Sequence, residues 1–214
     1  ITLATTSLSE DSLSLEIGTL GTTDTDQSTG VTFTYAIAEV AGSDYASFTI
    51  DQATGKLSFA SSVNPDHETK SSYSLTILTT DSGGKTFSKS FDIAVTNINE
   101  APTVKTAITD QTVAADSTLN FQIDTNVFAD IDVDDTLTYT ATLSAGATLP
   151  TWLNFDTTTQ KFSGTPINSN IGTIAVKVTA TDAGNLAVSD TFNITVTETV
   201  NQFAHLYTSG ALLA

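Results

Sequence analysis

The chain has 214 residues, enough for one large domain or for two domains of about 100 residues each. Its 24 acidic residues outnumber 7 basic ones, which gives a formal net charge of -17. Such an acidic surface repels nucleic acid and anionic lipid, and no apolar run reaches the length of a membrane helix. We therefore expect no nucleic-acid partner and no direct membrane insertion.

The composition also argues against an enzyme. The absence of cysteine excludes disulfides, thiolate zinc sites and cysteine nucleophiles. The only two histidines, His67 and His205, lie far apart in the sequence, and no nucleophile, base and orienting group can be assembled. The chain shows no signal peptide and begins at Ile1, so we expect it to be a piece of a longer protein.

Apolar and polar residues alternate in several short segments. In chain order the clearest are residues 31–35, 91–95, 174–180 and 192–196. A period of two, bounded at short intervals by Gly, Asn, Asp and Ser, is typical of antiparallel strands. No segment shows a helical stripe. The sequence therefore predicts an all-β fold of the sandwich type.

A comparison of the chain with itself predicts two domains. Residues 80–84 and 91–96 match residues 181–185 and 192–197 at an offset of 101, and Asp51 matches Asp156 at an offset of 105. A drifting offset is typical of loop insertions on a shared order of strands. We expect two tandem Ig-like or cadherin-like β-sandwiches. Their expected ranges are 1–101 and 102–200, followed by a tail of unknown role at 201–214.

Carboxylates gather in short groups along the chain, several with a spacing of two residues. On an extended or looped chain this spacing lets both side chains reach one ion, and carboxylate oxygens suit calcium. Neither Asp-x-Asp run matches an EF-hand loop. The alternative is that Asp and Asn serve only turn geometry in the loops of a sandwich. Asp134 and Asp135, after the second Asp-x-Asp run, are expected to be solvated, although one could supply an outer oxygen.

The order of these groups in the first half resembles a cadherin repeat. The resemblance covers residues 1–102 and rests on five motifs in order: Phe48–Asp51 with Thr54–Leu57, Asp66–Glu68, Tyr73–Leu75, Asp81 with Gly83 and Gly84, and Asn97–Pro102. The second half, residues 101–199, resembles the dystroglycan-type cadherin-like domain. That resemblance rests on Ile108–Gln111, Phe128–Tyr139, Leu149–Leu153, Phe162–Pro166 and Thr179–Gly184. Such pairs are similar to those of bacterial RTX-type adhesins and surface proteins.

The cadherin resemblance implies calcium at the junction of the two domains. Carried over residue by residue, its ligands would be Glu10, Asp66, Glu68, Asn99, Glu100, Asp130, Asp132 and Asp182. Asn97 stands where the family usually has Asp, which should weaken that site. A half-site for a preceding domain would be formed by Asp24, Asp26 and Asp81. Residues 163–166 replace the acidic triplet in the second half, so no strong site is expected at its far end.

The resemblance implies a calcium-binding tandem extender or adhesion module of a large bacterial adhesin, with calcium stiffening the interdomain junction. Its partners would be calcium, neighbouring domains of the same chain and a polysaccharide or cell-surface ligand. The expected location is extracellular, secreted or on the bacterial surface. The alternative is a calcium-dependent carbohydrate-binding module, which an exposed row of aromatic residues would favour. A homophilic adhesion module is a third reading, disfavoured because the amino terminus lacks a tryptophan for strand exchange.

Overall fold

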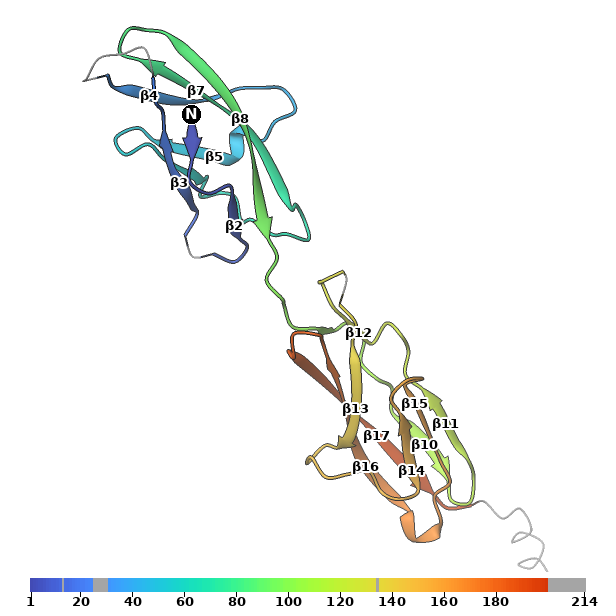
Figure 1. Cartoon of the computed structure of the whole chain (residues 1–214). Coiled ribbons are helices and arrows are strands. Elements are labelled where there is room, and N and C mark those ends of the chain that lie inside the picture. The colour runs from blue at the N-terminus through green and yellow to red at the C-terminus, as the bar shows by residue number, and fades with distance from the viewer. Residues whose placement is uncertain (13, 25–30, 134, 200–214) are drawn as a thin grey trace, which may run out of the picture. The chain divides into compact units, whose positions relative to one another are not determined.

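The computed structural model describes residues 1–12, 14–24, 31–133 and 135–199 (Figure 1). Its internal contacts divide the chain into two units, Ile1–Ile98 and Asn99–Ala214. Strands dominate both units, and the described helices are two short 3-10 turns, η1 (Tyr45–Ser47) and η2 (Asn168–Asn170). The predicted all-β class with two tandem sandwich domains is confirmed. The expected tail at 201–214 lies outside the described residues.

Unit 1 contains two four-stranded sheets, ordered β1-β3-β6-β5 and β2-β8-β7-β4. The strands are β1 (Thr2–Leu3), β2 (Ser7–Ser9), β3 (Glu16–Gly21), β4 (Phe33–Ala38), β5 (Phe48–Asp51), β6 (Lys56–Phe59), β7 (Ser72–Asp81) and β8 (Thr86–Thr96). All pairings are antiparallel except the one between β2 and β8, which is parallel.

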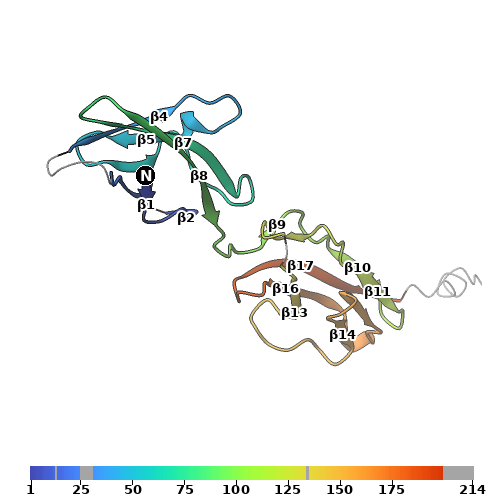
Figure 2. The ribbon, with the colours of Figure 1, turned by 45° about the horizontal axis from the view of Figure 1, so that its top comes forward.

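Unit 2 repeats this plan with a four-stranded sheet, β10-β17-β16-β13, and a three-stranded sheet, β11-β15-β14 (Figure 2). A two-stranded ribbon, β12-β9, completes it. The strands are β9 (Thr103–Val104), β10 (Gln111–Ala114), β11 (Leu119–Gln122), β12 (Phe128–Ala129), β13 (Thr138–Leu143), β14 (Leu153–Asp156), β15 (Lys161–Gly164), β16 (Gly172–Thr181) and β17 (Ala187–Thr197). No described helix is long and apolar enough to cross a membrane.

The two units share strand registers as well as strand order. Thr79 of β7 pairs with Phe87 of β8, and Ala180 of β16 pairs with Val188 of β17, each 101 residues later. The parallel pairs β2–β8 and β10–β17 also correspond. The offset found in the sequence is therefore the offset of equivalent positions in two copies of one fold.

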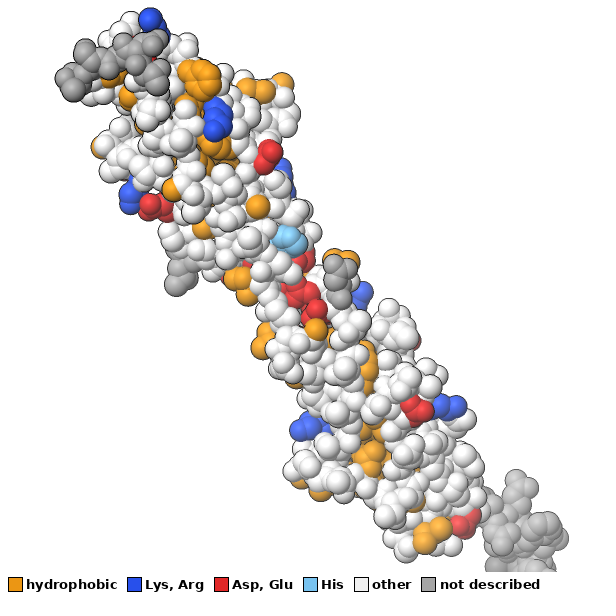
Figure 3. Space-filling model, viewed as in Figure 1, with side chains coloured by type: hydrophobic (Ala, Val, Ile, Leu, Met, Phe, Trp, Pro, Cys, Tyr) orange, Lys and Arg blue, Asp and Glu red, His pale blue; other side chains and the backbone are white. Residues whose placement is uncertain are grey.

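Each unit has its own core, built from the alternating apolar residues. Every second residue of β7 is buried, and in β8 Phe91, Ile93 and Val95 are buried while their neighbours are exposed. The equivalent residues of β17 are buried in the core of unit 2, against which Trp152 packs as a half-buried side chain. Most of the surface in view belongs to the backbone and to side chains that are neither hydrophobic nor charged (Figure 3). Period-two burial therefore fixes which face of each strand lies inside.

Matching aspartates close the same hairpin turn in both units. Asp51 Oδ1 accepts hydrogen bonds from the N–H groups of Ala53 and Thr54, and Asp156 Oδ1 accepts them from Thr158 and Thr159. These bonds lower the pKa of both aspartates. For these two residues the turn geometry alone accounts for the carboxylate.

Gly164, at the end of β15, lies against the backbone of Trp152. A Cβ atom at this position would come within 2.0 Å of the Trp152 carbonyl oxygen, whereas one at Gly18 would make ordinary contacts of 3.4 Å or more. We expect Gly164→Ala to destabilise unit 2 by about 2 kcal/mol, because backbone must move to admit the methyl group. Fluorescence of Trp152, the only tryptophan, measures unit 2 unfolding in urea. Gly18→Ala, whose effect on unit 1 is measured by hydrogen exchange of the β7 amides, should cost well under half as much, and equal costs would contradict the steric account.

The carboxylate of Asp44, the residue before η1, accepts hydrogen bonds from Lys70 and from Ser74 of β7. Burial raises its pKa, but hydrogen bonds from Lys70 Nζ and the Ser74 N–H group, with the charge of Lys70, outweigh burial and lower the pKa. The ionised carboxylate therefore stabilises unit 1 at neutral pH, and this contribution disappears as the pH falls below the ordinary value of about 4 through the lowered pKa.

We expect Asp44→Asn to lower the stability of unit 1 at pH 7 by about 1 kcal/mol, a value discounted because Lys70 is partly exposed. The difference from the unsubstituted chain should shrink as the pH is lowered through 4. Hydrogen exchange of β7 amides in unit 1 provides the measurement. Glu39→Gln, which removes an exposed charge from the same unit, should change exchange little at either pH. A pH-independent loss in Asp44→Asn would show that the ionised carboxylate is not responsible.

Candidate metal centres

Glu10 is a buried carboxylate at the end of unit 1 where the chain leaves β8. It follows β2, is 3% exposed, and its N–H group donates to the Thr96 carbonyl oxygen at 3.2 Å. Oε1 accepts a hydrogen bond from the Ile98 N–H group at 2.7 Å, and Oε2 accepts one from the His67 N–H group at 2.6 Å. The two backbone donors hold the carboxylate between the 66–68 segment and the last residues of the unit.

Asp66 and Glu68 complete the first acidic cluster, Glu10–Asp66–Glu68. One carboxylate oxygen from each residue lies within 4.8 Å of the other two. The pKa of Asp66 is lowered by hydrogen bonds from the Thr69 N–H group at 2.9 Å and the Thr69 hydroxyl at 3.0 Å. Glu68 Oε1 lies 3.0 Å from His67 Nδ1. Three carboxylates so close together repel one another unless a cation lies among them.

A second cluster, Asp130–Asp135–Asp182, lies in unit 2. Asp130 and Asp135 follow β12, Asp182 starts the turn between β16 and β17, and one oxygen from each lies within 4.8 Å of the others. Asp132 and Asp182 are 7% and 4% exposed. Within the loop, the Asp132 N–H group donates to Asp130 Oδ1 at 3.1 Å. Strand ends distant in sequence thus converge on one small acidic region.

The first residues of unit 2 are bound to this region. Asn99 Nδ2 donates to Asp182 Oδ2 at 3.0 Å, and the Glu100 N–H group donates to Asp132 Oδ2 at 3.0 Å. A Cβ atom on Gly184 would lie 2.5 Å from Asn99 Oδ1, so a side chain at this position would displace the Asn99 amide from its present place. The aspartates therefore fix the course of the chain as it enters unit 2.

Two buried carboxylate oxygens of the Asp130–Asp135–Asp182 cluster show whether the cluster suits a metal ion. Asp130 Oδ2 and Asp135 Oδ2 are buried and have no hydrogen-bond partner among the described residues. A buried, unpaired carboxylate oxygen is costly, and a cation would relieve that cost. All donors are oxygens, which suits a hard divalent ion, and loop-borne carboxylates suit calcium better than magnesium. The residues present therefore fit a calcium ion.

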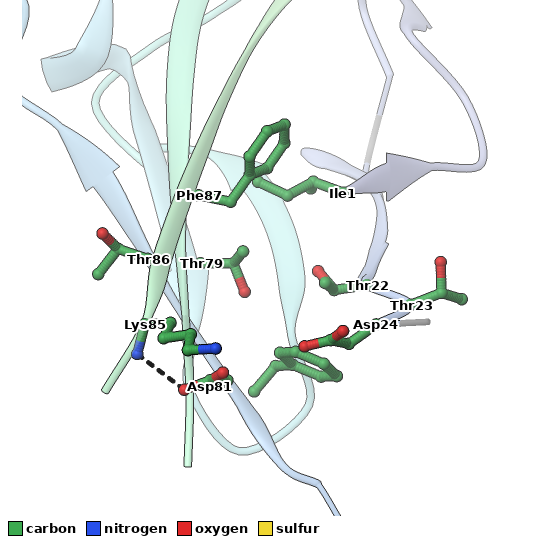
Figure 4. A pocket seen from close by; sticks show the side chains of 10 residues that line it. Ile1, Thr22, Thr23, Asp24, Thr79, Asp81, Lys85, Thr86 and Phe87 are labelled. Carbon is green, nitrogen blue, oxygen red and sulfur yellow. Dashed lines mark hydrogen bonds between the residues drawn. The ribbon is translucent and has the colours of Figure 1, made fainter. Parts of the chain in front are cut away.

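The expected half-site residues lie elsewhere in unit 1. Asp24 and Asp81 line one pocket with Lys85, and Asp81 Oδ1 accepts a hydrogen bond from the Lys85 N–H group at 2.8 Å (Figure 4). Asp81 immediately precedes the turn into β8, whereas Glu10 lies beside the last residue of that strand. Asp26 lies outside the described residues.

Two further positions complete the comparison with the sequence. Asn97 follows β8 as an exposed residue, next to Ile98, whose N–H group binds Glu10. Asp135, expected to be solvated, instead contributes a buried oxygen to the second cluster. In the sequence, only the short distance of five residues from Asp130 indicates that Asp135 could join the same site. The fold of the loop is what brings the two carboxylates together.

Comparisons with known proteins agree with this fold. Residues 4–96 match the cadherin domain family model, and residues 101–197 match the family model described as "Putative Ig domain". No curated protein sequence matches the chain.

Three solved structures show the extent of the structural similarity. The human mucin-like protocadherin EC1-2 structure has a TM-score of 0.58 at 18% identity, covering 92% of this chain and 98% of that one. Domains 3–6 of protocadherin gamma B2 give 0.64 at 17%, covering 90% and 50%. The human desmocollin-1 ectodomain gives 0.52 at 17%, covering 92% and 39%. The chain thus spans about two fifths of the desmocollin-1 structure, and identities this low show the fold alone. The family models thus find a cadherin domain at residues 4–96, followed by a match to the "Putative Ig domain" model at residues 101–197.

Proposed function

We propose that the chain is a calcium-binding extender module of a large bacterial cell-surface or secreted adhesin. The second domain would be of the dystroglycan type. Its partners would be calcium, neighbouring domains of the same long chain and a cell-surface or polysaccharide ligand at a more distant position. The proposed calcium ligands are the residues of the two acidic clusters, together with Asn97, Asn99, Glu100 and Asp132.

The observation that carries this proposal is the pair of buried oxygens in unit 2, Asp130 Oδ2 and Asp135 Oδ2. Neither has a hydrogen-bond partner among the described residues, although Asp182 contributes a third carboxylate within 4.8 Å. Turn geometry does not explain these oxygens, in contrast to Asp51 and Asp156, whose carboxylates are each bound by backbone N–H groups. A calcium ion would neutralise the cluster and supply the missing partner.

The way calcium would stiffen the chain follows from the hydrogen bonds inside each unit. Glu10 binds the N–H group of Ile98, and Asp182 binds the side chain of Asn99, the next residue. One residue of each acidic cluster is therefore hydrogen-bonded to one of the two adjacent residues Ile98 and Asn99. An ion that holds the carboxylates in place would restrict backbone rotation on both sides of this peptide bond. Without the ion, repulsion among the carboxylates would loosen the same residues.

Asp24, Asp26 and Asp81 would form a half-site that a preceding domain completes. Extracellular modules bind calcium at roughly 0.1 to 1 mM, so a secreted or surface location would keep such sites filled. A calcium-dependent carbohydrate-binding module is the second candidate function. The observation that favours it is the exposed aromatic ring of Phe87 beside the pocket that contains Asp24 and Asp81.

Asp132→Asn tests the assignment of ligands. We expect calcium affinity, measured by calorimetry on the whole chain, to fall at least about tenfold, because a charged oxygen is replaced by a neutral amide. Glu198→Gln is the matched control: it removes the same charge from an exposed position near the end of unit 2 and should leave affinity unchanged. Equal affinities for Asp132→Asn and the unsubstituted chain would contradict the assignment.

Removal of calcium tests the coupling of the ion to stability and stiffness. At a concentration one hundred times its dissociation constant, an ion that binds only the folded chain stabilises it by about 2.7 kcal/mol. A chelator should therefore lower the melting temperature. It should also broaden the pair-distance distribution and change the maximum dimension obtained from small-angle scattering. Magnesium should restore little, because it requires a tighter octahedral shell. Identical melting and scattering in calcium, magnesium and chelator would mean that the clusters are ordinary surface.

A further inference from the structure

One end of unit 2 corresponds to the end of unit 1 that holds the first acidic cluster. The registers of β7–β8 and β16–β17 differ by 101 residues, and so do two buried prolines, Pro65 and Pro166, which precede β7 and β16. Residues 66–70 and 167–171 are therefore equivalent. The registers thus place residues 167–169, and not the expected 163–166, at the positions of the acidic triplet.

The backbone is built in the same way at both of these ends, whereas the side chains differ. The Glu10 N–H group donates to the Thr96 carbonyl oxygen, and the Ala115 N–H group donates to that of Thr197. Ala115 is fully buried where unit 1 has the Glu10 carboxylate. The other exchanges from unit 1 to unit 2 are Asp66 to Ile167, Glu68 to Ser169 and Lys70 to Ile171. Unit 2 therefore has two isoleucines, and no carboxylate, at the positions of the first acidic cluster and Lys70.

These two isoleucines, Ile167 and Ile171, form an exposed surface that we call the isoleucine surface. They flank the turn η2 and are 55% and 45% exposed. The Ile167 N–H group donates to Asn170 Oδ1 at 2.9 Å, and the Ile171 N–H group donates to the Asn168 carbonyl oxygen at 3.3 Å. The turn is thus held by hydrogen bonds that do not involve the isoleucine side chains. Because unit 1 has charged residues at both positions, the fold does not require apolar ones, and a contact surface is favoured.

The chain leaves unit 2 beside the isoleucine surface. Thr199 is the last described residue, and its hydroxyl donates to the Ala115 carbonyl oxygen at 2.6 Å. The N–H group of the next residue, Asp116, donates at 2.7 Å to the carbonyl oxygen of Pro166, which directly precedes Ile167. Two hydrogen bonds therefore connect the exit of the chain to this surface.

The sequence that follows Thr199 suits an apolar surface. Residues 200–214 contain no Asp, Glu, Lys or Arg, although 14% of the whole chain is charged, and they include Phe203, Leu206 and Tyr207. The four residue steps from Thr199 to Phe203 span at most about 14 Å, so the aromatic side chain can reach only surfaces near the exit.

We propose that residues 203–207 dock on the isoleucine surface and cover this end of unit 2 without a metal ion. A weak apolar contact is sufficient, because a short linker gives the segment an effective concentration in the millimolar range. A second copy of the chain is a poorer occupant. It would bring its own exposed Asp116 and Glu198 to a surface that already has both charges beside it. The docking does not depend on the calcium clusters.

Limited proteolysis of the whole chain tests the docking. Chymotrypsin cuts after aromatic and leucine residues, and cleavage within residues 203–207 requires that the segment leave the surface. The double variant Ile167→Asp, Ile171→Lys introduces the residues that unit 1 has at these positions, so unit 2 should keep its fold, which Trp152 fluorescence checks. We expect cleavage at least about fivefold faster than in the unsubstituted chain, because the rate follows the population of the open form.

Val40→Asp is the matched control, because it replaces an exposed apolar residue of unit 1 by a charge and should leave the cleavage rate unchanged. The increase should be the same in calcium and in chelator, so the result stands even if the calcium clusters prove empty. Equal cleavage rates for the double variant and the unsubstituted chain would overturn the proposal. Protection that disappears on tenfold dilution would also overturn it, since the occupant would then be a second copy.

A second measurement uses a chain with both isoleucines in place. In methyl NMR spectra, replacing both Phe203 and Tyr207 by Ser should shift the δ-methyl signals of Ile167 and Ile171, because the ring currents of the docked aromatic residues are lost. Ile98, an exposed isoleucine of unit 1, provides the reference signal, which should not move. Unchanged signals of Ile167 and Ile171 would show that the segment does not occupy this surface.

Discussion

Buried carboxylates held by backbone N–H groups are the constraint on which the organisation of this chain depends. Glu10 is fixed by the N–H groups of His67 and Ile98, and Asp132 binds the N–H group of Glu100. Asp182 binds the N–H group of Leu186 and the side-chain amide of Asn99. In a chain with a formal charge of -17, the carboxylates within each acidic cluster repel one another unless they are neutralised. The same hydrogen bonds direct the chain out of one domain and into the next, so charge balance and linker conformation are coupled.

The duplicated architecture shows how one fold supports different chemistry. Asp81 and Asp182 lie at equivalent hairpin turns of the two units, β7–β8 and β16–β17. Each accepts a hydrogen bond from the N–H group four residues later. Asp182 lies in a carboxylate cluster beside Asn99, whereas Asp81 lines a pocket together with the buried Thr79 and the exposed Phe87. Because the turn alone fixes the backbone of both aspartates, the surrounding residues are free to differ between the units.

Each unit has a hydrophobic core made of its own residues. Each core is closed by alternating residues of its own two sheets, and the aromatic residues Phe48, Phe59 and Tyr73 pack together in unit 1. No acidic residue belongs to either core cluster. Ligand sites at the ends of a sandwich can therefore change charge or lose a side chain without opening the core, which is why loops carry function in such folds.

The sequence alone determined the fold class and the repeat, because period-two burial requires contiguous alternation such as Phe91, Ile93 and Val95. It also marked most acidic groups that the fold brings together. It did not reveal the buried oxygen of Asp135 or the unpaired hydroxyl of Thr79. Burial and missing partners at those positions depend on residues distant in the chain, the first on Asp182 and the second on the β3 end. Local patterns encode which face of a strand lies inside, whereas only tertiary structure decides which strand ends meet.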